Sequence, residues 1–198
     1  MKNIHTYFFI LFLCSCSNPF LNEKEYIRWI AGHKDDLCIT KDIGNFKIKV
    51  EYIPVDLKIL QDCKGVGLTK EKYDSMRRKL DGMQYYIIRL SLKDKNFDLL
   101  QYQLKDESDY ALRVKYLSFD IQQDLKLEEE GLSSPCLLSL FERTYGLSPE
   151  VTIDAAFANT HKNCSKTFVW EDNMFNNGTI NITFDKKLFN RIPNLKLQ

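Results

Sequence analysis

The chain has 198 residues, of which 44% are hydrophobic and 13% aromatic, and this is enough apolar surface for a packed core. Its 28 Lys and Arg residues against 27 Asp and Glu residues leave it nearly uncharged, without the basic excess typical of nucleic-acid-binding proteins. Composition therefore excludes global disorder, gives no support for a nucleic-acid partner, and fits a single domain of roughly 100–200 residues.

The N-terminus has the pattern of a secretory signal peptide. Lys2 and His5 form a short basic region, and residues 7–13 form an apolar run without a charge. This run is far shorter than the roughly 20 apolar residues that a membrane-spanning helix needs. We therefore expect a signal that is removed from the mature protein.

The apolar run ends in Leu13-Cys14-Ser15-Cys16. This sequence resembles the lipobox of bacterial lipoprotein signal peptides, in which an aliphatic residue and two small residues precede a cysteine. The resemblance implies cleavage before Cys16, a diacylglycerol on its thiol and an acyl chain such as palmitate on its amine. It covers these four residues and the basic and apolar regions before them. The alternative is an ordinary cleaved signal peptide, with Cys16 free or in a disulfide.

The lipoprotein resemblance implies a location in the bacterial cell envelope, with the membrane bound through the N-terminal lipid anchor on Cys16. In the enterobacterial sorting rule an Asp after the lipidated cysteine retains the protein in the inner membrane, so Ser17 implies the outer membrane. Loss of Lys2 with the signal leaves 27 basic and 27 acidic residues. The expected organisation is a signal peptide over 1–15, a lipidated cysteine and short tether over 16–21, and one domain over 22–198.

Four cysteines remain in the body of the chain, and none forms a C-x-x-C pair with another. Their wide spacing argues against a zinc site, whose ligands come a few residues apart. An exported protein can form disulfides, so all four are candidates: Cys38, Cys63, Cys136 and Cys164. Cys38–Cys63 and Cys136–Cys164 are the local pairings, and free thiols are the alternative.

In the first half of the chain, apolar spacing predicts mostly helices and a hairpin. A helix is expected over 22–31, with Asn22 and Glu25 as a capping box and Trp29 buried. The other expected elements are a hairpin of strands 37–41 and 46–53, helices over 55–61 and 69–80, and a strand over 83–92. That last strand is apolar on both faces, so we expect it at the centre of the sheet.

The second half is predicted to be mainly strands. Residues 97–117 fit both periods, and we interpret them as helical to about Leu117, with a strand beyond. Four further strands are expected over 136–143, 151–158, 167–172 and 179–184, with Asn177-Gly178 as a turn. A short apolar segment over 188–195 closes the chain. The fold class expected is α+β, mainly antiparallel, with helices concentrated in the N-terminal half.

Few residues suggest chemistry. His161 lies three residues before Cys164, but a nucleophilic pair needs spatial contact and a third orienting group. The glycine-containing segment 64–70 lacks the remainder of the known phosphate-binding fingerprints. The basic run Arg77-Arg78-Lys79 could face anionic head groups, although a solvated helix face is the commoner use. We therefore predict no catalytic residues, no metal ligands and no cofactor.

The function predicted is a non-catalytic binding or interaction module whose partner is an envelope protein or a glycan. One alternative is a hydrolytic envelope enzyme that uses His161 or carboxylates such as Asp154 and Glu142. Another is a structural subunit of an envelope assembly. A concave pocket with converging polar groups would favour the enzyme, and an exposed aromatic patch would favour binding.

Overall fold

One antiparallel sheet of eight strands, in the order β2-β3-β4-β7-β6-β5-β8-β9, forms the body of the molecule. The computed structural model describes residues 19–64, 67–94, 97–145 and 147–197, so the predicted signal peptide, Cys16 and Gly65-Val66 lie outside it. The strands are β2 (Cys38–Ile43), β3 (Phe46–Ile53), β4 (Met83–Leu92), β5 (Leu125–Glu129), β6 (Leu132–Glu142), β7 (Val151–Ala158), β8 (Lys166–Asp172) and β9 (Gly178–Phe184).

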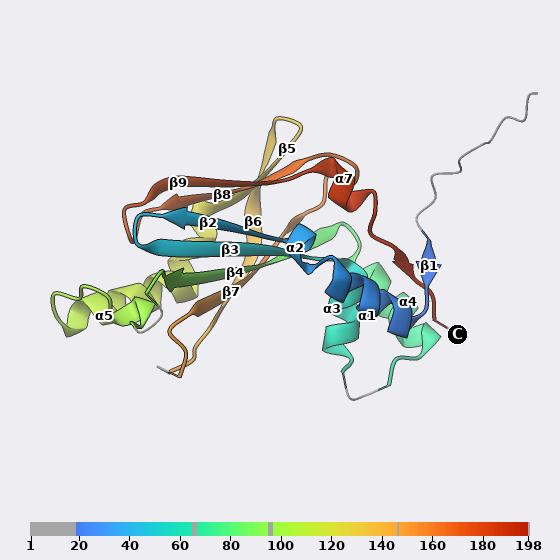
Figure 1. The fold of residues 1–198 in the computed structure, drawn as a ribbon, viewed down its shortest axis with the longest axis horizontal. Helices are drawn as coiled ribbons and strands as arrows, with labels where there is room; N and C mark the ends of the chain where they lie inside the picture. The colour runs from blue at the N-terminus through green and yellow to red at the C-terminus, as the bar shows by residue number, and fades with distance from the viewer. Residues whose placement is uncertain (1–18, 65–66, 95–96, 146, 198) are drawn as a thin grey trace, which may run out of the picture.

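The sheet curls until its two edge strands, β2 and β9, lie side by side (Figure 1). Lys41 bridges them, because its ammonium donates to the Asn181 carbonyl at 3.2 Å. The result is a nearly closed barrel. The predicted α+β class with a mainly antiparallel sheet is confirmed.

Helices occupy the two ends of this barrel (Figure 1). They are α1 (Glu23–Gly32), α2 (Lys34–Leu37), α3 (Val55–Asp62), α4 (Lys70–Leu80), η1 (Leu99–Gln101), α5 (Glu107–Lys115), η2 (Tyr116–Asp120), α6 (Ile121–Asp124) and α7 (Lys186–Phe189). Helices α1, α3 and α4 gather at one end, and α5 lies at the other (Figure 1). At the α1 end the short strands β1 (Phe20–Leu21) and β10 (Asn194–Leu195) pair in parallel and bring the first and last described segments together.

Helix α1 begins with the predicted capping box. The Asn22 side chain accepts from the Glu25 backbone N–H at 3.0 Å, and the Glu25 carboxylate accepts from the Asn22 N–H at 3.2 Å. Trp29 packs against the core as predicted but is only partly buried, and the fully buried residue of α1 is Tyr26. Trp29 also stacks on His33, one helical turn away, at 4.1 Å between ring centroids.

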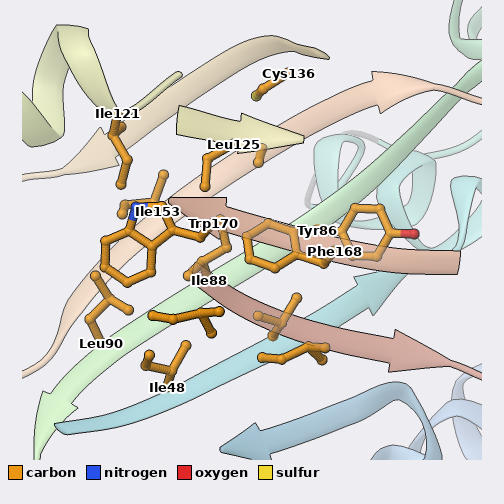
Figure 2. Close-up of a cluster of buried hydrophobic side chains, with 14 of the residues drawn as sticks. Ile48, Tyr86, Ile88, Leu90, Ile121, Leu125, Cys136, Ile153, Phe168 and Trp170 are labelled. Atoms are coloured by element: carbon orange, nitrogen blue, oxygen red, sulfur yellow. The ribbon is translucent and has the colours of Figure 1, made fainter. Parts of the chain in front are cut away.

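Strand β4 lies in the middle of the sheet, between β3 and β7, as its apolar character predicted. Its inward residues Tyr86, Ile88 and Leu90 fill the barrel, where Trp170 and Phe168 of β8 meet them (Figure 2). Its outward residues lie on the opposite face, because side chains alternate along a strand. The core covers the inner face of β4, and on the outer face Tyr85 and Ile87 are partly buried against a cluster that includes Leu57 of α3.

The strand predicted beyond Leu117 exists, but its predicted start was about seven residues too early. Helical conformation continues through η2 and α6 to Asp124, and β5 starts at Leu125. Leu117 and Ile121 are four residues apart, and both are buried in the core, so packing selects the helical period where both periods fitted.

The connection from β8 to β9 is longer than the predicted Asn177-Gly178 turn. Asp172 organises it: one carboxylate oxygen accepts from the N–H groups of Met174 and Phe175, and the other from the N–H and side-chain amide of Asn177. Gly178 adopts a φ of +72° at the start of β9, a value that favours glycine.

Candidate functional site

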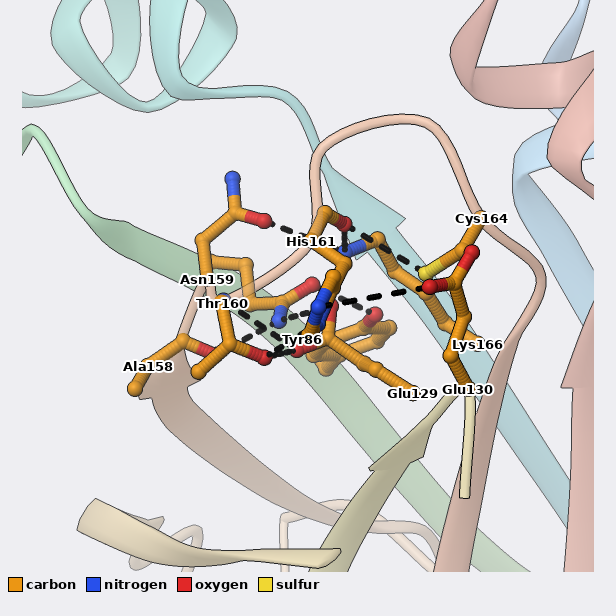
Figure 3. A network of polar contacts seen from close by, with 10 residues as sticks. Tyr86, Glu129, Glu130, Ala158, Asn159, Thr160, His161, Cys164 and Lys166 are labelled. Atoms are coloured by element: carbon orange, nitrogen blue, oxygen red, sulfur yellow. Dashed lines mark hydrogen bonds and ion pairs between the residues drawn. The ribbon is translucent and has the colours of Figure 1, made fainter. Parts of the chain in front are cut away.

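An ion pair between Glu129 and Lys166 is buried at one end of the barrel (Figure 3). Their side chains are 1% and 2% exposed. Besides Glu129, the Lys166 ammonium donates to the Asn159 side-chain oxygen at 3.1 Å and to the His161 carbonyl at 2.8 Å. All three ammonium protons are thus used, which is the condition for a stable buried lysine.

The Glu129 carboxylate is equally saturated. One oxygen also accepts from Gln84 at 3.1 Å, and the other accepts from the N–H of Thr160 at 3.2 Å and from its hydroxyl. Burial acts to raise the pKa of Glu129, but the hydrogen bonds from Lys166, Thr160 and Gln84 prevail and hold it below its ordinary value. Because the Lys166 ammonium protons and both Glu129 oxygens are all hydrogen-bonded, the pair stabilises the fold and neither group is free to act as an acid or a base.

His161 and Cys164 are neighbours in this region, but they do not form a nucleophilic pair. The Cys164 thiol donates to the main-chain carbonyl of His161 at 3.4 Å. The His161 ring instead lies 3.2 Å from the Thr160 hydroxyl through Nδ1 and 4.0 Å from the Glu130 carboxylate through Nε2. Burial raises the pKa of Cys164, which disfavours the reactive thiolate.

All four body cysteines are free thiols in the structure, so neither Cys38–Cys63 nor Cys136–Cys164 is formed. The sulfur of Cys63 lies 3.3 Å from that of Met76, and the Cys136 thiol donates to the Leu138 carbonyl at 3.1 Å. Burial raises the pKa of Cys136 to about 11. Within the described ranges, no three residues of the metal-ligating types His, Cys, Asp and Glu come together.

The basic run on α4 is split by the fold. Arg77 is half-buried with its Nε 3.5 Å from Asp56, whereas Arg78 and Lys79 are exposed to solvent. The start of α4 is capped by Thr69, whose hydroxyl accepts from the Lys72 N–H at 3.3 Å, as expected for a helix N-cap rather than a phosphate loop.

A groove with mostly apolar walls lies on the outer face of the sheet. Strand register aligns Tyr85 with Ala156 and Ala156 with Leu138, and Ile87 with Asp154 and Asp154 with Leu140. The hollow measures about 170 Å³. Its lining comes from α3 and from strands β3, β4, β7 and β6: Ile53, Lys58, Gln61, Tyr85, Tyr86, Ile87, Leu138, Leu140, Asp154, Ala155 and Ala156.

The wall of this groove that β6 forms is exposed to solvent. Leu138 and Leu140 of β6 are 60% and 59% exposed, although β6 is an interior strand of the sheet. Helix α3 packs on β4 and forms the other wall, so β6 lies beyond its cover. The small side chain of Ala156 leaves the hollow between them. Exposed leucines on an interior strand mark a surface that a partner can cover.

Asp154 lies half-buried in the groove with no hydrogen bond or ion pair to any residue in the described part of the chain. Burial raises the pKa of its carboxyl, while the charges of Lys58 and Arg89 act to lower it. Both cations have closer partners, because Lys58 binds Asp62 at 2.6 Å and Arg89 binds Glu51 at 2.6 Å. The groove therefore combines apolar walls with one carboxylate that has no cation of the described residues within ion-pair distance.

The comparisons with known proteins add no relative from which a role could be carried over. No protein-family model, curated protein or solved structure matches the chain. Among the described helices, none is both long and apolar enough to cross a membrane. The function is therefore inferred from the groove itself, in which a single unpaired carboxylate lies beside two exposed leucines.

Proposed function

We propose that the protein is a lipid-anchored binding module of the bacterial cell envelope, and that its outer-face groove docks a segment of another envelope protein. The observation that carries the docking proposal is the unpaired Asp154 beside the exposed Leu138 and Leu140. The partner segment presents apolar side chains together with one Lys or Arg.

The chemistry of the groove supports this choice of partner. Covering Leu138 and Leu140 removes apolar surface from water, which stabilises a complex by roughly 25 cal/mol per Å². A Lys or Arg side chain suits the position of Asp154, because its aliphatic stem packs on apolar walls while its charged end reaches the carboxylate. Such a counter-charge also sets the register of docking and discriminates against acidic segments.

The anchoring proposal rests on the lipobox resemblance at Leu13-Cys14-Ser15-Cys16. Each buried CH₂ contributes about 0.8 kcal/mol, so two acyl chains on Cys16 hold a protein stably at a membrane. At roughly 3.5 Å per extended residue, at most about 14 Å of chain separates Cys16 from Phe20 in β1. A tether this short keeps the binding module close to the membrane surface.

Metabolic labelling in a bacterial host with an alkyne fatty acid tests the anchor. We expect the wild-type protein to carry the label and to sediment with membranes, and Cys16→Ser to lose the label and the lipid-dependent association. Cys38→Ser, which removes a half-buried cysteine of the body, is the matched control and should behave as wild type. Equal labelling of the Cys16→Ser protein would show that the anchor is not at this residue.

Site-specific photo-crosslinking in cells tests the groove. A photoreactive residue at Leu140 should give a discrete protein adduct, whose cross-linked peptide carries Lys or Arg among apolar residues. The same residue at Leu112, which is 59% exposed on α5, is the control. Asp154→Lys should abolish the Leu140 adduct without lowering stability, because this carboxylate makes no hydrogen bond within the described residues.

Three outcomes would refute the groove proposal: identical adducts from Leu140 and Leu112, an adduct unaffected by Asp154→Lys, or cross-links to lipid alone. Each of these results is independent of the labelling experiment. The anchor and the docking surface can therefore fail separately.

A further inference from the structure

A second cleft lies at the end of the barrel where α1, α3 and α4 gather, away from the exposed leucines of β6. It measures about 170 Å³ and lies among α1, the β3–α3 junction, the end of α4, the loop after β7 and the last residues of the chain. Its lining is polar and aromatic: Tyr26, Tyr52, Pro54, Val55, Asp56, Arg77, Leu80, Asp81, Gly82, Met83, Asn159, Lys162, Asn163, Lys166, Phe189, Ile192, Pro193 and Asn194.

Tyr26 lines this cleft and is 0% exposed, yet its hydroxyl is the one buried side-chain polar atom of the described residues without a hydrogen-bond partner. After burial, the charge of Asp56 contributes most to the raised pKa of Tyr26, but both Asp56 oxygens already accept hydrogen bonds from other groups. One Asp56 oxygen accepts from the Tyr73 hydroxyl at 2.9 Å and the other from the Leu195 N–H at 2.9 Å. A buried hydroxyl without a hydrogen-bond partner destabilises the folded protein unless a ligand or a water molecule supplies that partner.

Tyr52 contributes a second hydroxyl with no hydrogen bond to the described residues. Burial raises the pKa of Tyr52 to about 12, and burial together with the charge of Asp56 raises that of Tyr26 further. Both hydroxyls are neutral at physiological pH and can donate. The cleft thus presents two unused donors from neighbouring elements.

The charged groups around the cleft cancel one another. Arg77 lies 3.5 Å from Asp56, Lys162 lies 3.8 Å from Asp81, and Lys166 is paired with Glu129. Asn159 uses its oxygen for Lys166, which leaves its N–H₂ group as a further donor. A site with balanced charge and several neutral donors selects a neutral ligand rich in acceptor oxygens.

We propose that this cleft binds one sugar ring, as the terminal residue of a glycan, with ring hydroxyl oxygens accepting from Tyr26 and Tyr52. The volume is below the roughly 300–1,000 Å³ of pockets for drug-sized ligands, so it fits one ring rather than a nucleotide cofactor. Hydroxyl oxygens accept hydrogen bonds, which matches a site that offers the Tyr26 and Tyr52 hydroxyls and the Asn159 amide as donors. This inference requires neither the lipid anchor nor the outer-face groove.

Isothermal titration calorimetry of the full-length protein, in a detergent without a sugar head group, tests the proposal. The probes are methyl glucoside and methyl N-acetylglucosaminide, with glucuronate and inorganic phosphate as anionic comparisons. We expect a neutral glycoside to bind and both anions to bind more weakly. Tyr26→Phe and Tyr52→Phe should each raise the Kd of the glycoside by up to about tenfold, which corresponds to the loss of one hydrogen bond.

Tyr145→Phe removes an exposed hydroxyl elsewhere and is the matched control. The unbound Tyr26→Phe protein should be at least as stable as wild type, because the lost hydroxyl has no partner. A destabilised Tyr26→Phe protein, unchanged glycoside affinity in both tyrosine variants, preference for the anions, or no binding of either glycoside would each overturn the proposal.

Discussion

Replacing Lys166 by Met removes one partner of the buried ion pair and leaves Glu129 charged in the protein interior. Glu129 is 1% exposed, and the remaining donors, Gln84 and Thr160, do not neutralise it. Breaking a buried pair in this way costs about 3–5 kcal/mol of unfolding free energy. For a domain of this size that corresponds to a fall in Tm of roughly 6–20 °C.

Urea unfolding followed by the fluorescence of the buried Trp170 measures the loss. Lys126→Met is the matched control, because Lys126 forms an ion pair with Glu171 at 2.7 Å on the solvent-exposed surface, and we expect little change there. The double variant Glu129→Leu/Lys166→Met should lose less than the sum of its single variants, since neither charge is then left alone. A Lys166→Met protein as stable as Lys126→Met, or strict additivity in the double variant, would refute this reasoning.

Two further predictions concern carboxylates. The folded-state pKa of Glu129 is lowered, so its contribution to stability is complete above its unfolded pKa of about 4.3 and is lost as the pH falls through the folded value. Thermal unfolding between pH 7 and pH 3 should therefore show a steeper loss of stability for wild type than for Glu129→Gln. Parallel curves for the two proteins would contradict this prediction. Asp172→Ala should lower the free energy of unfolding in urea by roughly 1–3 kcal/mol, because four donors of the β8–β9 connection lose their acceptor. An unchanged urea midpoint would show that these hydrogen bonds do not stabilise the protein.

Most elements with a strong local signal were predictable. The capping box of α1, the β2–β3 hairpin, helices α3 and α4, and the central strand β4 follow from residues a few positions apart. The segment after Leu117 was not, because helical and strand periods fitted it equally and only packing of Ile121 into the core separates them.

The groove was only partly visible in the sequence. The sequence offered Asp154 only as one of two example carboxylates for a hydrolase, and its lack of an ion pair depends on Lys58 and Arg89 being bound elsewhere. Leu138 and Leu140 read as strand residues with no hint of exposure. Which face of an interior strand stays bare depends on how far helix α3 extends over the sheet, and no local pattern records that distance.

The sequence by itself determined the fold class and most element positions, and it carries the signal pattern from which the envelope anchor is proposed, because these depend on local spacing. Only the tertiary structure decided that, of three consecutive glutamates at 128–130, the middle one is buried and the other two are exposed. The β5–β8 register sets Glu129 directly opposite Lys166, 37 positions along the chain, and buries both. Such a pairing follows from strand order and register, which are set by the packing of the whole barrel.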